Sequence, residues 1–161
     1  MNGQPQELIL KRMQETVELS LRQVDRGGIP FAAMVLDVHG RVLGSGVNQV
    51  REHHDPTAHA EVQAMRNACA RAGATRLPGT ILLASGEPCA LCYLAALYAG
   101  VTQIWFAASR DEAAAHGFDY RDTYRIFAHD PLDWPAAASA RLAVPPAHKP
   151  FHAHRARGRA P

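Results

Sequence analysis

The sequence predicts an α/β fold in which a sheet alternates with helices. Three observations support this prediction. Apolar residues recur at helical spacing over residues 6–26, two apolar segments around a His-Gly turn are typical of a β-hairpin, and the strand-like segments TILLAS (80–85) and QIWFAA (103–108) alternate with helical segments. The chain has 161 residues, of which 47% are hydrophobic and 20% are charged. This size and composition fit one globular domain, which we expect to span residues 1–161.

The first half of the chain contains clear start and stop signals. A Gly-Gly pair ends the first helix, and a polar segment with one proline separates the hairpin from the second helix, which Asp55 or Thr57 can cap and Gly73 ends. The expected elements are a helix over 6–26, antiparallel strands over 31–38 and 41–47, a loop over 48–57 and a helix over about 58–72.

The sequence pattern in the second half of the chain predicts strands joined by helices. The segments 80–85 and 103–108 are short apolar runs of the kind found in buried strands, and the helical segment between them ends at Gly100. Because right-handed crossovers join parallel strands, we expect these two strands to be parallel. DEAAAHG and YRDTYRIF, which follow, predict short helices.

Composition also constrains location and partners. No run of eighteen apolar residues occurs, and the N-terminal MNGQPQELIL lacks the features of a signal peptide, so we expect a cytoplasmic protein without a membrane span. The three cysteines are an odd number, and two of them lie three positions apart. In a reducing compartment this spacing indicates metal or redox chemistry rather than a disulfide framework.

The positive charge is concentrated at the C-terminus. After Asp133 the chain has no acid and five basic residues, and the part before that tail has 12 basic and 15 acidic residues. Proteins that grip nucleic acid normally spread basic side chains over a folded face, so nucleic-acid binding is not indicated. The tail residues, which could either contact RNA or form a solvated terminus, are Arg141, Lys149, Arg155, Arg157 and Arg159.

The segment HDPTAHAEVQAM (54–65) places His59 and Glu61 two positions apart at the start of a helical pattern. One interpretation is that His59 caps the helix and Glu61 is a solvated acid favoured by the helix dipole. The other interpretation is chemical, and it depends on the segment PCALC (88–92). There Cys89 and Cys92 lie one turn apart at the start of another helix, where thiolates are favoured.

His59, Cys89 and Cys92 together offer one nitrogen and two sulfur ligands. A catalytic zinc site needs three protein ligands and an open fourth position, whereas a structural site needs a fourth protein ligand. Cys69 lies ten residues from His59 and is expected in the core. Glu61 then has a function: zinc lowers the pKa of bound water to about 7, and a nearby carboxylate can relay its proton. A C-x-x-C pair alone could instead be a redox pair.

These motifs resemble a known family. HAE (59–61) and PCALC (88–92) match the H-x-E and P-C-x-x-C signature of zinc-dependent nucleobase deaminases. GGIPFAAMV, GVNQV and GFD extend the likeness over roughly residues 8–130 to the bacterial guanine deaminase branch of the cytidine deaminase superfamily. The resemblance implies a three-layer α-β-α fold with a mixed five-stranded sheet and helices on both faces. It also implies one Zn²⁺ per chain and a homodimer whose C-terminal segment, about 145–161, contacts or swaps onto the partner.

The resemblance also assigns site residues. It implies zinc ligands at His59, Cys89 and Cys92, a proton shuttle at Glu61, and substrate contacts from Asn48, the backbone of Ala60 and the ring of Phe31. One departure concerns the purine-binding acid, because GFDYRD places Tyr120 where the family has a second acid. Asp119 is our expected substitute, with Asp122 and Glu112 as alternatives.

The predicted function is hydrolytic deamination of a free purine base by zinc-bound hydroxide, with guanine converted to xanthine and ammonia. The alternatives are guanosine, cytosine or an aminotriazine as substrate. Deamination of tRNA adenosine is less favoured, because the body is acidic and the tail is expected to cover the site. A binding protein with structural zinc is disfavoured by Glu61 and by the missing fourth ligand.

Overall fold

The computed structural model describes residues 3–130, 133, 142 and 145–157. The chain divides into two compact units, residues 1–127 and 128–161. The elements of the first unit are α1 (Gly3–Asp25), β1 (Ala32–Leu36), β2 (Val42–Val47), α2 (Val50–His53), α3 (Ala60–Ala72), β3 (Ile81–Gly86), α4 (Ala90–Ala99), β4 (Gln103–Ala108), α5 (Arg110–Ala115) and the 3₁₀ helix η1 (Arg121–Ala128), whose last residue falls in the second unit.

The four described strands form one mixed sheet in the order β2-β1-β3-β4. β1 pairs antiparallel with both β2 and β3, which confirms the predicted hairpin. β3 and β4 pair in parallel, as expected for strands joined through α4. The prediction of five strands is wrong for the part of the chain that the structure describes, which contains four.

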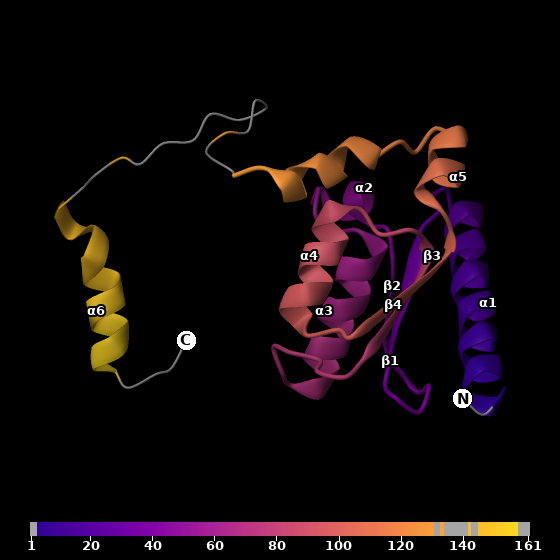
Figure 1. Ribbon diagram of the computed structural model, residues 1–161, viewed down its shortest axis with the longest axis horizontal. Helices are drawn as coiled ribbons and strands as arrows, with labels where there is room; N and C mark the ends of the chain where they lie inside the picture. Colours follow the sequence, from indigo (N-terminus) through magenta and orange to yellow (C-terminus); the bar gives the residue numbers. More distant parts are fainter. Residues whose placement is uncertain (1–2, 131–132, 134–141, 143–144, 158–161) are drawn as a thin grey trace. The chain divides into compact units, whose positions relative to one another are not determined.

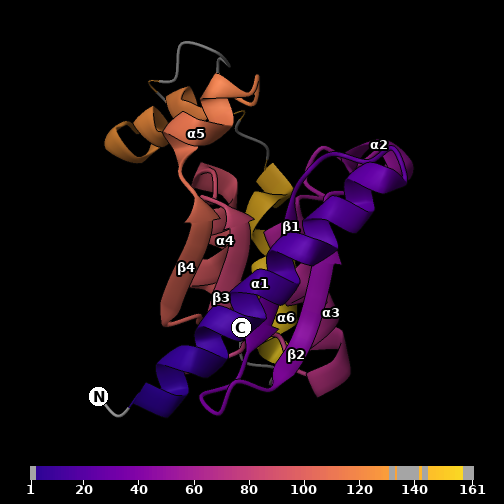
Figure 2. The ribbon, with the colours of Figure 1, turned by 90° about the vertical axis from the view of Figure 1, so that its right-hand side faces the viewer.

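Helices cover both faces of this sheet, which confirms the three-layer prediction (Figures 1 and 2). Successive residues of a strand point to opposite faces. On one face, Met34, Leu36, Ile81 and Leu83 pack with Ile9 and Met13 of α1. On the other face, Ala33, Val35 and Leu82 pack with α3 and α4 through Ala60, Ala64, Met65, Ala68, Ala96 and Ala99.

Two glycines let β2 lie directly against α3. A Cβ at Gly46 would lie 2.5 Å from the Ala64 nitrogen and 2.6 Å from the Ala60 oxygen. A Cβ at Gly44 would lie 2.5 Å from the Ala64 oxygen and from the Ala68 nitrogen. Because each clash is with backbone, only glycine permits this approach, and it fixes the first turn of α3 relative to the sheet.

Three local predictions need correction. Residues 48–57 contain the short helix α2, which polar composition alone did not indicate. β4 was expected to be buried but lies at the sheet edge, with Trp105 and Phe106 exposed by 53% and 41%. An apolar run does not reveal whether a neighbouring strand covers it. YRDTYRIF forms 3₁₀ turns rather than an α-helix.

In the second unit, Pro145–His148 form a 3₁₀ turn and Lys149–Ala156 form α6. The described side chains of α6 are exposed. Arg141 and Arg159, from the predicted basic tail, lie outside the described residues, as do residues 158–161 of the predicted swapped segment. Within the described chain, no helix is both long enough and apolar enough to cross a membrane.

Candidate metal centre and active site

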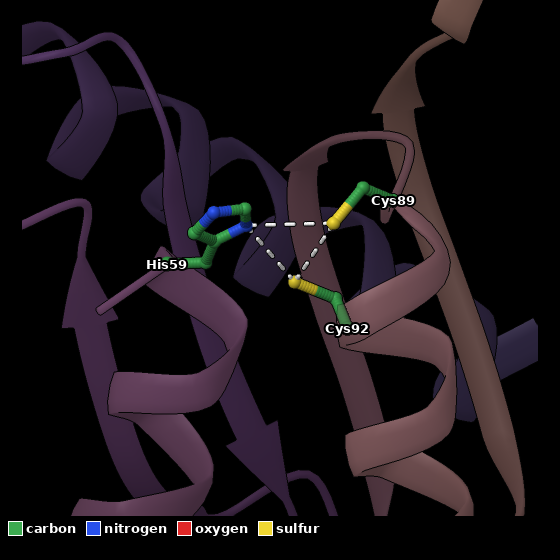
Figure 3. Close-up of side chains that lie close together, drawn as sticks. All are labelled: His59, Cys89 and Cys92. Carbon is green, nitrogen blue, oxygen red and sulfur yellow. Dashed lines mark hydrogen bonds between the residues drawn. The ribbon is translucent and has the colours of Figure 1, made fainter. Parts of the chain in front are cut away.

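Three side chains from two helix starts converge at one point (Figure 3). The Nδ1 atom of His59 lies 3.4 Å from the Cys89 sulfur and 3.5 Å from the Cys92 sulfur, and the two sulfurs are 3.7 Å apart. Tetrahedral zinc with bonds of about 2.3 Å to sulfur and about 2.0 Å to nitrogen separates its ligand atoms by about 3.5 to 3.8 Å. The observed spacing therefore fits one zinc ion without rearrangement.

The helix starts leave these side chains available for a metal. His59 is the N-cap of α3 and Cys89 is the N-cap of α4, and neither side chain makes a capping hydrogen bond. Cys92 lies in the first turn of α4 and is buried. The positive ends of both helix dipoles point at the centre, which stabilises thiolates there.

The thiols of Cys89 and Cys92 differ in acidity. The hydrogen bond with Cys92, followed by that with His59, lowers the pKa of Cys89 to about 4, despite the opposing effect of burial. The hydrogen bond to Cys89 and burial raise the pKa of Cys92 far above its ordinary value. The hydrogen bond with Cys89 also raises the pKa of His59. Cys89 is therefore the more acidic thiol of the pair, and its thiolate form is the one that the surrounding groups favour.

Glu61 lies in the first turn of α3 beside the three ligands and is 6% exposed. Its Oε2 atom accepts a hydrogen bond of 3.4 Å from the Cys92 thiol. Burial raises the pKa of this carboxyl group, and no other influence is larger. A buried carboxyl group with a raised pKa holds a proton more readily than an exposed one, so Glu61 is suited to general acid–base chemistry.

The three predicted substrate contacts differ in their surroundings. Asn48 is buried, and its Oδ1 atom accepts the Val50 N–H at 3.2 Å, which leaves the amide nitrogen as the group that can donate to a base. Ala60 is the first residue of α3, where a backbone N–H lacks an intrahelical acceptor. The half-buried ring of Phe31 meets the rings of Phe118 and Tyr120 edge-on, with centroids 5.4 and 6.4 Å away.

Asp119 is exposed, and both of its oxygens are engaged by Arg121, at 2.9 Å from Nε and 2.7 Å from one terminal nitrogen. These hydrogen bonds lower the pKa of Asp119 to about 2. A role in substrate binding stays a prediction, and it requires this pair to open. Of the alternatives, Glu112 forms a capping box with Ser109, and Asp122 lies 3.6 Å from Arg125.

Sequence reasoning missed a set of polar groups at the turn between β3 and α4, residues 87–89, here called the cysteine turn. The buried Glu87 carboxylate forms an ion pair with Arg110, whose guanidinium carbon lies 3.8 Å from the centroid of the Tyr124 ring. The hydroxyl groups of Tyr120 and Tyr124 donate to backbone carbonyls of the same turn. The one available signal was Glu87 itself, an acid at the end of a buried strand, which must be paired.

Comparisons with known proteins place these residues in context. The family model described as the cytidine and deoxycytidylate deaminase zinc-binding region matches residues 6–108. A guanine deaminase from Bacillus subtilis is 40% identical over 120 residues, which cover 74% of this chain and 74% of that protein. Its solved structure aligns with a TM-score of 0.80 at 33% identity, covering 89% of this chain and 91% of that chain.

Other relatives differ in their functions and lengths. A tRNA-specific adenosine deaminase from Agrobacterium fabrum is 37% identical over 91 residues, which are 56% of this chain and 59% of that protein. A tRNA(Ile)-lysidine synthase from Deinococcus deserti is 40% identical over 115 residues, or 71% of this chain. This chain spans 22% of the length of that synthase.

Proposed function

We infer the function from one premise, that this chain belongs to the cytidine and deoxycytidylate deaminase family, and propose that it hydrolytically deaminates a free purine base. Guanine, converted to xanthine and ammonia, is the first candidate. The observation that carries the proposal is a buried Glu61 carboxyl group beside a His/Cys/Cys group that fits zinc.

The match to the family's zinc-binding region, together with the His/Cys/Cys group, confirms the prediction of one Zn²⁺ per chain. We propose that His59, Cys89 and Cys92 hold this ion. When bound, zinc acts as a Lewis acid and lowers the pKa of water to about 7. The three residues would supply two thiolates and a neutral imidazole, and the two negative charges would neutralise the charge of the ion.

Glu61 moves the protons of the reaction. It takes one proton from the attacking water and delivers it to the ring nitrogen next to the carbon that bears the amino group. It then transfers the second proton of that water to the departing amine. A C–O bond forms, a C–N bond breaks, and water plus the aminated base become the oxo base plus ammonia. Burial of Glu61 supports both transfers, because it holds the carboxyl pKa above its ordinary value.

The free purine base is supported by the similarity to guanine deaminase over most of both chains. The groups around the metal suit a flat aromatic ring: the amide of Asn48 can donate to it, the Ala60 N–H lies between ligand and shuttle, and Phe31 offers an apolar edge. Guanosine, cytosine and aminotriazines are the alternative small substrates. Deamination of tRNA adenosine is the second candidate, which the Agrobacterium fabrum relative favours.

The substrate is tested by measuring ammonia release from the zinc-loaded protein. The panel contains guanine, guanosine, adenine, cytosine, cytidine, an aminotriazine and a tRNA anticodon hairpin. We expect the highest kcat/KM with guanine. Deamination of the hairpin without turnover of any free base or nucleoside would replace the first candidate by the second.

We also propose a cytoplasmic homodimer in which the C-terminal segment, about 145–161, contacts the partner. The exposed Trp105 and Phe106 support a dimer, because β4 has a strand partner on one edge only within the described sheet. Light scattering coupled to gel filtration should give twice the mass of the chain. A monomer at micromolar concentration would contradict the proposal.

A further inference from the structure

The turn between β3 and α4 carries the metal ligand Cys89 and has few backbone partners of its own. The Glu87 N–H donates to the Ala108 carbonyl at 2.8 Å, and Pro88 has no N–H to donate. The Glu87 carbonyl accepts from the Tyr120 hydroxyl at 2.6 Å, and the Pro88 carbonyl accepts from the Tyr124 hydroxyl at 2.5 Å. Two consecutive carbonyls before Cys89 are therefore held by tyrosines more than thirty residues further along the chain.

The start of α4 is held by the same distant segment. The N-cap position is occupied by Cys89, whose sulfur faces His59 and Cys92 and makes no capping hydrogen bond. Instead the Ala90 N–H donates to Thr123 Oγ1 at 3.3 Å, and the Thr123 hydroxyl donates to the Tyr120 carbonyl at 2.7 Å. Thr123 therefore supplies a hydrogen-bond acceptor for the start of α4. The side chain of the N-cap residue Cys89 does not supply one.

This segment is itself anchored. The Arg110 backbone N–H donates to Glu87 Oε2 at 2.8 Å, and its Nε donates to Oε1 at 2.8 Å. The guanidinium lies over the Tyr124 ring. The buried Glu87 carboxylate therefore links α5, the cysteine turn and the tyrosine that clamps it. Such a charge-assisted pair limits how far the segment can move.

We propose that Tyr120, Thr123 and Tyr124, here called the clamp, are positioning residues that set the place of the Cys89 sulfur for zinc. Their hydroxyl groups bond to backbone groups of the turn and of the start of α4, and not to the ligand side chains. They act through the backbone of the turn, because fixing the groups on both sides of Cys89 fixes its Cα and Cβ. Groups that orient metal ligands in this indirect way are typically worth about 10- to 100-fold in metal affinity. The proposal rests on the zinc site of the proposed function and adds residues that no motif identifies.

The test measures zinc binding directly, without an activity assay. Tyr124→Phe removes one clamp hydroxyl, and Tyr98→Phe is the matched control, because Tyr98 is 78% exposed on the outer face of α4. Metal-free full-length protein is titrated with Zn²⁺ in competition with a chromophoric chelator. We expect zinc affinity to fall about 10- to 100-fold in Tyr124→Phe and to stay unchanged in Tyr98→Phe.

A second pair separates positioning from packing. Thr123→Val keeps the volume and loses the hydroxyl group, whereas Thr123→Ser keeps the hydroxyl group. We expect Thr123→Val to weaken zinc binding and Thr123→Ser to restore it. The Co²⁺-loaded proteins give an independent readout, since a displaced Cys89 sulfur shifts the thiolate-to-cobalt absorption and the ligand-field bands. This pair decides the proposal if Tyr124→Phe does not fold.

The clamp is refuted if folded Tyr124→Phe and Thr123→Val bind zinc with the affinity of the unaltered protein and give the same cobalt spectrum. It is also refuted if Thr123→Ser loses affinity as strongly as Thr123→Val. Failure of the proposed function looks different. In that case the unaltered protein binds zinc and the variants bind it more weakly, but no base in the panel releases ammonia.

Discussion

The helices α3 and α4 bring the proposed zinc ligands together, but they hold them in different ways. The helix α3, whose N-cap is His59, lies on β2 so closely that Gly44 and Gly46 have no room for a side chain. The helix α4, whose N-cap is Cys89, has an outer face with Leu97 and Tyr98 exposed by 69% and 78%. Its first turn is fixed by hydroxyl groups from another segment.

Two kinds of contact can therefore hold a helix start that carries a metal ligand. One is close backbone packing, and the other is hydrogen bonding by side chains from another segment, here called polar clamping. Backbone packing is intolerant of added volume, because the atoms that would clash cannot move independently. Polar clamping tolerates added side-chain volume. It depends instead on individual hydrogen-bond donors and acceptors, each of which contributes about 1 kcal/mol. The two halves of the site should therefore respond to different kinds of substitution.

The largest effect is expected where the two halves meet, at Glu61, which lies on α3 and accepts a hydrogen bond from Cys92 of α4. Glu61→Gln should lower kcat by about 10²- to 10⁴-fold, which corresponds to about 3 to 5 kcal/mol, because the proton shuttle is lost. Zinc content should stay near one per chain, since the three ligands remain. Steady-state kinetics and elemental analysis of the same preparation check both statements. Undiminished turnover would remove Glu61 from the mechanism.

Gly46→Ala should have the next largest effect, on stability. The added Cβ would lie 2.5 Å from the Ala64 nitrogen and 2.6 Å from the Ala60 oxygen, both of which belong to the backbone of α3. We expect the free energy of unfolding to fall by about 2 to 3 kcal/mol, because the helix must move as a unit. Chemical denaturation measures this loss. A change below about 0.5 kcal/mol, which is the usual range of surface substitutions, would show that α3 is not held by close packing.

Gly86→Ala makes the same change next to the cysteine turn. Its Cβ would lie 2.7 Å from Cε1 of the Phe31 ring, which is a side chain and can rotate away. We expect a smaller loss of stability, about 1 kcal/mol, together with a raised KM, since Phe31 is a proposed substrate contact. Denaturation and kinetics of the two alanine variants should be compared side by side. A larger loss of stability in Gly86→Ala than in Gly46→Ala would reverse the comparison.

The metal-binding group and the clamp differ in how far the sequence predicts them. The grouping of His59, Cys89 and Cys92 could be predicted because each lies in a short motif at the start of a helical pattern, and helix starts have recognisable signals. The hairpin and the parallel strands followed from apolar segments and turns. None of this required knowledge of long-range contacts.

The clamp could not be predicted in this way. Its hydroxyl groups reach residues 33 to 36 positions away, and such contacts leave no periodic pattern. Tyr120 was interpreted only as the replacement of an acid, although its hydroxyl group holds the Glu87 carbonyl. The exposure of β4 was not predicted for a related reason. The sequence of an apolar strand does not reveal whether another strand or solvent lies at its outer edge.

The smallest effect is expected in the polar loop before His59, where Asp55 accepts the Thr57 N–H at 2.8 Å and the Thr57 hydroxyl at 2.7 Å. These bonds, with a weaker effect of Arg66, lower the pKa of Asp55 below its ordinary value of 3.8. A carboxylate with a lowered pKa stabilises the fold above that ordinary value, and the stabilisation is lost as pH falls through the lowered one. Asp55→Asn should therefore slightly lower the Tm at neutral pH, and the difference should vanish in acid.

The same variant tests whether His59 is held by packing or by hydrogen bonds. If close packing of α3 holds His59, the exposed loop contributes little, and zinc affinity should be the same in Asp55→Asn and in the unaltered protein. The measurement is the chelator competition used for Thr123→Val, alongside thermal unfolding at neutral and acidic pH. A fall in zinc affinity as large as that of Thr123→Val would mean that His59, like Cys89, is placed by hydrogen bonds to its turn, and that packing against Gly44 and Gly46 is not sufficient.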